Sequence, residues 1–183
     1  AALARALALD PPLLFLDEPT SGLDPISAAA FDDLIAYLHQ ELNLTVVMIT
    51  HDLDTIFLIC TRVGVVVDRK MVQGTREEIV KNPHPWIQAY AAKALSRRTA
   101  DAGLETLFEL ASGQLSTDKQ VQALAVQGMA VWNEIVSVPY LIQILQANPG
   151  IASDTMAALR RAAGLDVGRF PASWFEWYRE EKE

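Results

Sequence analysis

Two adjacent carboxylates, Asp17 and Glu18, follow a run of four apolar residues, "LLFL", at positions 13–16. An unbroken apolar run favours a strand buried on both faces, as in the parallel sheet of an α/β domain. The carboxylates then lie at the carboxyl end of that strand, the edge at which open α/β sheets bind ligands. Two acids placed there can hold a metal ion and activate a water molecule. The alternative is a turn that leads into a helix, where Asp and Pro are common.

A histidine, His51, directly follows a second strand-like segment. Residues 45–50, "TVVMIT", are rich in β-branched side chains, which favour a buried strand. Between the two strands, apolar residues recur at helical spacing and predict a helix from residue 27. Its apolar stripe comprises Phe31, Leu34, Ile35, Leu38 and Leu42. Taken alone, His51 at this position is typical of a capping or surface residue.

Residues 14–25, "LFLDEPTSGLDP", resemble the Walker B strand and the D-loop of ATP-binding-cassette (ABC) ATPases. The match runs through twelve consecutive positions and is highly specific, and His51 stands where this family keeps its switch histidine. The resemblance implies an α/β fold, part of a P-loop NTPase cassette with parallel strands and helices. It extends to about residue 90.

The resemblance implies that three residues act directly on ATP. Asp17 would hold Mg²⁺ through a water molecule, because this ion prefers oxygen ligands and keeps several of its waters. Glu18 would polarise the attacking water, and His51 would contact that water and the γ-phosphate. Since phosphoryl transfer depends on positioning and charge stabilisation, loss of Glu18 or His51 should slow hydrolysis by orders of magnitude.

The turn after Glu18 has a different role in the resemblance. Ser21, Gly22 and Asp24 lie in the D-loop, which in ABC ATPases crosses to the partner subunit of a dimer that sandwiches the nucleotide. We therefore expect these three residues to contribute to nucleotide binding, with Asp24 coupling the two sites without doing chemistry itself. The implied partner is a second ATPase subunit in a homodimer.

One part of an ABC site does not occur in the 183 residues. A cassette needs a phosphate loop of the form GxxxxGK[ST], whose backbone N–H groups and lysine cradle the nucleotide phosphates. The sequence contains no such loop, and only twelve residues precede the run at 13–16, too few for the family's Q-loop and LSGGQ signature. We therefore expect the chain to be the carboxyl-terminal part of a longer cassette protein.

The sequence after His51 continues the cassette pattern. We expect a short helix over 52–60, a strand over 62–68, a hairpin turn in "RKMVQGT", and a helix over 75–81. Similar strand, hairpin and helix elements close most importer-type ABC ATPases.

Two further segments, "DPISAAAFD" and "HPWIQAY", resemble the ATPases of bacterial phospholipid importers that maintain outer-membrane lipid asymmetry. In that subgroup the ATPase dimer lies under a membrane permease and beside a small STAS-domain protein. The resemblance implies a subunit that powers phospholipid transport and is peripheral at the cytoplasmic face of the bacterial inner membrane.

The composition narrows the function classes. No apolar run approaches the ~20 residues of a membrane-spanning helix. The net charge is -8, with no basic cluster beyond Arg97 and Arg98, which argues against nucleic acid as a partner. Cys60 is the single cysteine, which excludes an intrachain disulfide and favours a buried free thiol. His39 and His84 lack neighbours at metal-ligand spacing and are expected at the surface.

Strand-like runs disappear after Arg98, and three helical stripes replace them. The stripes are Leu104, Leu107, Phe108 and Ala111; Val121, Leu124, Ala125 and Gly128; and Val138, Leu141, Ile142 and Leu145. Asp118 and Ser153 are candidate N-caps, and Asp101 could cap the first of these helices. Successive helices of this kind resemble HEAT-like repeats, which bury their apolar faces only by stacking.

The end of the chain is rich in aromatic residues and resembles the ending of bacterial HEAT-repeat chains. The residues are Trp174, Phe175, Trp177 and Tyr178. We expect them to form a terminal cap that packs on the last repeat, in preference to an aromatic binding site. The sequence thus predicts a cassette part over 1–94 and an all-α HEAT-like region over 99–183, whose expected role is to bind another protein.

Three functions stay open at this point. The first is an ABC ATPase subunit of a transporter with a HEAT-like tail for docking. The second is a non-catalytic adaptor, in which the helical half acts and the cassette remnant is vestigial. The third is a soluble ABC ATPase that has no permease. The short spacing between Glu18 and His51 and the importer-like hairpin favour the first over the third.

Overall fold

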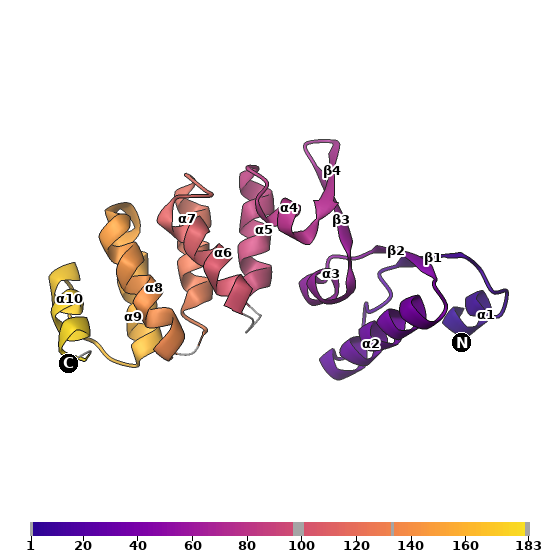
Figure 1. Ribbon diagram of the computed structural model, residues 1–183, viewed down its shortest axis with the longest axis horizontal. Helices are drawn as coiled ribbons and strands as arrows, with labels where there is room; N and C mark the ends of the chain where they lie inside the picture. The colour runs from indigo at the N-terminus through magenta and orange to yellow at the C-terminus, as the bar shows by residue number, and fades with distance from the viewer. Residues whose placement is uncertain (1, 97–100, 133, 182–183) are drawn as a thin grey trace. The chain divides into compact units, whose positions relative to one another are not determined.

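The computed structural model describes residues 2–96, 101–132 and 134–181 (Figure 1). These residues pack into two compact units, Ala1–Val63 and Gly64–Glu183. None of the helices in the described parts of the chain is both long and apolar enough to cross a bilayer.

The first unit alternates helices and strands, as the sequence predicts for an α/β fold. Its elements are α1 (Ala2–Leu7), β1 (Leu13–Asp17), α2 (Pro25–Glu41), β2 (Thr45–Ile49) and α3 (Leu53–Ile59). β1 and β2 pair in parallel, with Leu13 opposite Thr45 and Asp17 opposite Ile49. Because two parallel strands run in the same direction, their carboxyl ends meet at one edge of the sheet.

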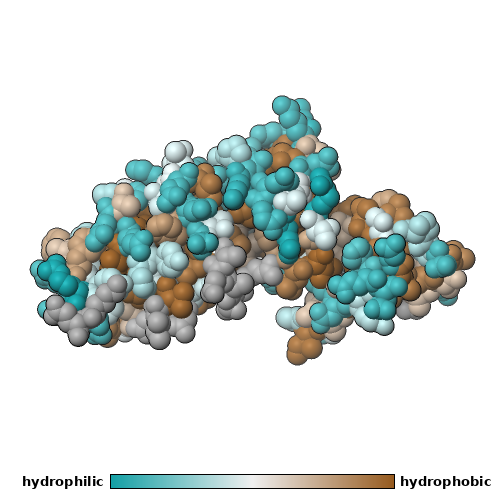
Figure 2. Space-filling model, in the orientation of Figure 1, coloured by the Kyte–Doolittle hydropathy of each residue, from teal (hydrophilic) through white to brown (hydrophobic). Residues whose placement is uncertain are grey.

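Only one face of this two-stranded sheet is covered by described residues. Leu14 is 5% exposed, whereas Phe15 is 70% and Ile49 is 64% exposed. Successive side chains alternate between the two faces of a strand, so Phe15 and Ile49 lie on the open face. The expectation that the run at 13–16 is buried on both faces is therefore wrong here. Exposed apolar residues are visible as brown atoms on the surface (Figure 2).

α2 buries a narrower apolar face than the sequence predicts. Of the predicted stripe, Ile35 is buried, and Phe31 and Leu38 are half-buried. Leu34 is 44% and Leu42 is 54% exposed, so the prediction is wrong for these two residues. α2 is 17 residues long and contacts α3, which is 7 residues long and too short to cover the whole stripe.

A hairpin and a short helix follow α3, and the boundary between the two units falls within the first strand of this hairpin. β3 (Arg62–Val67) and β4 (Lys70–Thr75) pair through a turn at Asp68 and Arg69, which have φ angles of +49° and +62°. Positive φ at both central residues is what a two-residue hairpin turn requires. α4 (Arg76–Val80) then begins with a capping box between Thr75 and Glu78. The predicted strand, hairpin and helix are confirmed.

The rest of the second unit consists of stacked helices in two layers. The helices are α5 (Pro85–Ser96), α6 (Asp101–Ser112), α7 (Lys119–Met129), α8 (Glu134–Ala147), α9 (Ala152–Ala163) and α10 (Pro171–Glu180), with a 3-10 turn η1 (Pro149–Ile151) before α9. In one layer α5 packs against α7 and α7 against α9. In the other, α6 packs against α8 and α8 against α10 (Figure 1).

The predicted stripes form the core between these layers. Their residues are buried except Phe108 and Leu124, which are half-buried. Asp118 caps α7 as predicted, since its carboxylate accepts hydrogen bonds from two backbone N–H groups of the first turn. Ser153 does not cap α9: η1 runs directly into this helix, so Ile151 takes the N-cap position. The side chain of Asp101 lies outside the described residues.

α5, which the sequence assigns to the cassette part, packs among the helices of the predicted HEAT-like region. Ile87 is 1% and Ala92 is 0% exposed, and α5 contacts both α6 and α7. The Gln88 Nε2 atom donates a hydrogen bond of 2.7 Å to the carbonyl of Leu115, in the loop between α6 and α7. The compact units divide at residues 63 and 64, and the join at 94–99 stays a prediction.

The aromatic end of the chain packs as a cap. Trp174 is 0% exposed, and its ring meets that of Trp177 edge to face at 5.6 Å. Phe175, Trp177 and Tyr178 are half-buried, and α10 contacts α8 and α9. This packing confirms the expected terminal cap.

Candidate functional site

The candidate site lies at the carboxyl edge of the β1–β2 sheet. Asp17 is the last residue of β1, and the backbone N–H of Glu18 donates a hydrogen bond of 2.8 Å to the carbonyl of Ile49. Thr50 and His51 follow β2 at the same edge. The parallel register thus brings residues 33 positions apart in the sequence into one place.

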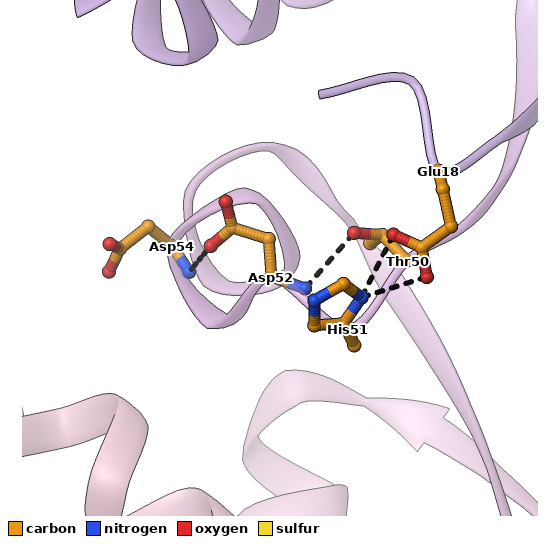
Figure 3. A network of polar contacts seen from close by, with 5 residues as sticks. All are labelled: Glu18, Thr50, His51, Asp52 and Asp54. Atoms are coloured by element: carbon orange, nitrogen blue, oxygen red, sulfur yellow. Dashed lines mark hydrogen bonds and ion pairs between the residues drawn. The ribbon is translucent and has the colours of Figure 1, made fainter. Parts of the chain in front are cut away.

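Glu18 and His51 form an ion pair at this edge (Figure 3). The His51 Nδ1 atom lies 2.9 Å from both carboxylate oxygens of Glu18. The His51 side chain is 84% exposed and that of Glu18 is 36% exposed. The hydrogen bond that His51 donates to the Glu18 carboxylate, followed by the negative charge of Glu18, raises the pKa of His51 above its ordinary value of 6.5. The pair therefore favours the imidazolium form of His51.

The backbone of Glu18 adopts a left-handed conformation, with a φ of +43°. This region costs a residue with a side chain roughly 1–2 kcal/mol, because Cβ approaches the following carbonyl oxygen. The hydrogen bond from the Glu18 N–H to Ile49 helps to hold the residue in place despite this cost. Residues kept in such regions gather at functional sites, and here the strain turns the chain sharply at the end of β1.

Capping interactions fix the segment that carries His51 (Figure 3). The Asp52 N–H donates to the Thr50 hydroxyl at 3.0 Å, and the Asp54 N–H donates to the Asp52 carboxylate at 2.9 Å. Asp52 is the N-cap of α3. Sequence analysis missed Thr50 and Asp52 as positioning residues. The signal was present, because Asp directly before an apolar helical segment is a common N-cap.

The predicted D-loop residues lie in the turn between β1 and α2. The Ser21 N–H donates to the Glu18 carbonyl at 3.0 Å, and Gly22 has a φ of +79°, which favours glycine. Asp24 caps α2 and accepts hydrogen bonds from Ile26 N and Ser27 N at 3.0 and 3.1 Å. Hydrogen bonds from Ser27, that of its hydroxyl first, lower the pKa of Asp24. The helix-entry turn is thus present, and it also places Ser21, Gly22 and Asp24 directly after Glu18.

The oxygen atoms at this edge suit a hard cation. Asp17 is exposed, and its carboxylate stands next to that of Glu18 in the chain. Mg²⁺ binds proteins through one or two carboxylates and otherwise keeps its waters and substrate phosphates. No group of three or more potential metal ligands gathers among the described residues. The donor set therefore fits a cation held by Asp17 through water, while His51 offers a donor for a phosphate or a water molecule.

A buried carboxylate on α2 was also missed by sequence analysis. Asp32 on α2 is 4% exposed and accepts a hydrogen bond of 2.7 Å from the hydroxyl of Thr55 on α3. Burial raises the pKa of Asp32. The signal was an acidic residue beside Phe31 and Ile35, on the apolar side of the predicted helix. Its partner lies 23 residues away and has no local pattern.

The other two histidines have structural contacts. His84 was expected at the surface but is half-buried: its Nε2 lies 3.1 Å from a carboxylate oxygen of Asp68, and its Nδ1 accepts a hydrogen bond from the Trp86 N–H. His39 is exposed, and its Nδ1 lies 2.7 Å from the Leu44 carbonyl. Cys60 is half-buried and not fully buried as expected.

Comparison with known proteins defines the class to which the chain is related. No family model matches the chain. Its homologues are ATP-binding subunits of ABC transporters, which match over part of their length.

Three relatives illustrate the similarity. The methionine import ATP-binding protein MetN of Photobacterium profundum is 31% identical over 144 residues, 78% of the chain and 40% of that protein. The intermembrane phospholipid transport system ATP-binding protein MlaF of Haemophilus influenzae is 41% identical over 83 residues, 45% of the chain and 31% of that protein. MetN of Vibrio cholerae is 28% identical over 175 residues, 95% of the chain and 49% of that protein.

The chain spans less than half the length of each of these relatives. Because the match to the Vibrio cholerae protein covers 95% of the chain, it includes most of the helical region after residue 98. The similarity to ATP-binding subunits is therefore not confined to the α/β unit.

Proposed function

We propose that the chain is part of an ATP-hydrolysing subunit of an ABC transporter. The observation that carries this proposal is the pairing of Glu18 with His51, beside Asp17, at the carboxyl edge of a parallel sheet. The homologous ATP-binding subunits support the class. In the complete protein the site would bind ATP with Mg²⁺ and hydrolyse it.

Each residue has a separate role in this proposal. Asp17 holds the Mg²⁺ through water, and this ion would neutralise charge on the phosphates. Glu18 accepts a hydrogen bond from the attacking water, while His51 contacts the same water and the γ-phosphate. Ser21, Gly22 and Asp24 contribute to nucleotide binding through the turn after Glu18.

Replacement of one atom in Glu18 tests the assignment in the complete protein. Glu18→Gln keeps the size and backbone strain of the residue but removes its charge and basicity. ATP turnover should fall by about 100-fold or more, while nucleotide binding persists. Glu41→Gln, the same change at an exposed glutamate at the end of α2, should leave turnover unchanged. Turnover in Glu18→Gln equal to that of Glu41→Gln would overturn the assignment.

Within this class we propose phospholipid as the transported substrate. The segments "DPISAAAFD" and "HPWIQAY" and the 41% identity to MlaF support it. Methionine is the second candidate, because the methionine import proteins MetN of Photobacterium profundum and Vibrio cholerae match 78% and 95% of the chain, whereas MlaF matches 45%. If phospholipid is the transported substrate, the complete subunit with its permease should hydrolyse ATP faster in phospholipid vesicles than without lipid. Stimulation by methionine alone would select the second candidate.

The proposed partners follow from the transporter. They are a second copy of the subunit, a membrane permease at the cytoplasmic face of the bacterial inner membrane and, with a phospholipid substrate, a STAS-domain protein. Co-purification with a permease supports this set. A complete protein that binds no ATP would instead favour the non-catalytic adaptor.

For the helical region we propose a HEAT-like module that binds another protein. The two stacked layers of α5–α10 support this role, since such stacks present extended surfaces to partners.

A further inference from the structure

We propose that the outer face of the α6–α8–α10 layer binds a segment of a partner protein that carries arginine or lysine between aliphatic residues. This inference rests on the proposed protein-binding role of the helical region and assigns it a surface and a partner chemistry. We call this surface the acidic face. Its residues that are not fully buried include Glu105, Phe108, Glu109, Val136, Tyr140, Gln143, Glu176 and Glu180.

Charge is divided unequally between the two layers of helices. Among the side chains that the structure describes, α6, α8 and α10 carry four acidic residues, Glu105, Glu109, Glu176 and Glu180, and one basic residue, Arg179. The sequences of α5, α7 and α9 contain four basic residues and one acidic residue, Asp154. The acidic excess of the helical region is therefore concentrated on one layer. A surface with one sign of charge attracts a partner of the opposite sign and repels nucleic acid and anionic lipid.

Aromatic rings lie among these carboxylates. Phe108 of α6 and Tyr140 of α8 meet edge to face, with ring centroids 5.3 Å apart, at the seam between the two helices. Both rings are half-buried, and Val136, one turn before Tyr140, is 40% exposed. Exposed Glu105 lies one turn before Phe108 and Glu109 follows it directly.

The combination of rings and carboxylates selects the chemistry of the partner. A guanidinium or ammonium group can stack on an aromatic ring and pair with a neighbouring carboxylate at the same time. Aliphatic side chains next to the cation would cover the remaining apolar surface at Val136 and the seam. A segment with both features fits this face better than a purely basic or a purely apolar one.

A binding experiment on the full chain tests the acidic face. The probe is a fluorescein-labelled synthetic peptide of alternating leucine and arginine, followed by fluorescence anisotropy at low salt. The double variant Glu105→Lys/Glu109→Lys should bind it about tenfold more weakly than the wild type, since two favourable charge pairs become repulsive. The control Asp33→Lys/Glu41→Lys changes the net charge equally, at exposed residues of α2, and should bind within about twofold of the wild type.

Several results would overturn the inference. Equal weakening in the test and control variants would show that only net charge matters. Binding of an otherwise identical leucine–glutamate peptide with similar affinity, or no binding of the leucine–arginine peptide, would also contradict it. Circular dichroism of both variants confirms that a loss of binding does not reflect unfolding.

A crosslinking experiment separates this inference from the proposed protein-binding role. A photo-crosslinking amino acid replaces Gln143 on the acidic face or Gln127, an exposed residue of α7 in the other layer. We expect the Gln143 position, in cells, to capture a segment of another protein with an excess of Arg and Lys. Capture at Gln127 alone would overturn the assigned face but keep the binding role. Capture of a second copy of this chain at Gln143 would replace the proposed partner, and no capture at either position would refute the binding role itself.

Discussion

Glu18 combines a strained backbone with an exposed ion pair. Its φ of +43° turns the chain at the end of β1, and its carboxylate lies 2.9 Å from His51 Nδ1. The carboxylate that would accept a proton from water is therefore already occupied by a hydrogen bond in this structure. Because a carboxylate has about four lone-pair sites, Glu18 can keep this contact and still accept a hydrogen bond from a water molecule.

The protonation of His51 should depend on Glu18. The raised pKa of His51 means that the pair stabilises the fold fully below about pH 6.5, and progressively less as the pH rises through the folded pKa. In an NMR titration of the chain, the midpoint for His51 should lie above 6.5 and fall in Glu18→Gln. The signals of His39 and His84 serve as internal references. An unchanged His51 midpoint in the variant would show that the ion pair does not form in solution.

Among the elements, α5 connects the cassette-like sequence to the helical stack. An added Cβ at Gly128 of α7 would lie 2.9 Å from the Cβ of Ser96, so the two helices approach closely where glycine permits it. Gln88 of α5 donates to the Leu115 carbonyl in the loop between α6 and α7, and Gln122 of α7 donates to the Ser116 carbonyl in the same loop. Asn148 donates to the Ala111 carbonyl near the end of α6. α5 and the tail helices therefore share one core.

Truncation should reveal this shared core. Removal of residues 97–183 exposes the face of α5 that carries Ile87 and Ala92, so residues 64–96 should lose their cooperative unfolding. Because the truncated chain could fail to fold altogether, Gln88→Leu provides a milder test. It leaves the Leu115 carbonyl without its donor and should lower the free energy of unfolding by about 1–3 kcal/mol.

Chemical denaturation measures the free energy of unfolding of both variants, and Gln143→Leu is the control at an exposed position. Unchanged stability of residues 64–96 after truncation would instead support the boundary that the sequence predicts at 94–99.

The sequence predicted the elements whose signals are local. The apolar run before Asp17, the β-branched run before His51, and the Asp118 cap all depend on residues within one turn or strand. The predictions that failed depend on neighbours distant in sequence or on an adjoining element. Phe15 is exposed because no described element covers that face, and the 3-10 turn before α9 moves the cap from Ser153 to Ile151. The pairing of Glu18 with His51 in one site was predictable only through the family resemblance.

At the scale of the whole molecule, the two compact units differ in how they are stabilised. Residues 1–63 contain a sheet with one open face and a buried carboxylate, Asp32, whose Oδ1 atom has no hydrogen-bond partner among the described residues. Residues 64–183 contain a continuous core in which Leu107, Leu141 and other side chains are 0% exposed. We therefore expect the two units to unfold in separate transitions, with residues 1–63 unfolding at the lower temperature.

Two substitutions assign these transitions. Asp32→Asn keeps an acceptor for Thr55 but removes a buried charge. At a pH above the raised pKa of Asp32, it should therefore raise the temperature of the lower transition. At acidic pH, where the wild-type carboxyl is protonated, its effect should be smaller. Leu107→Ala should lower only the upper transition, by about 2–5 kcal/mol, because it leaves a cavity in a closed core. Calorimetry at two pH values measures both. A single transition that both substitutions shift would show that the units unfold together, and a lower transition destabilised by Asp32→Asn at neutral pH would show that the first unit needs the charge.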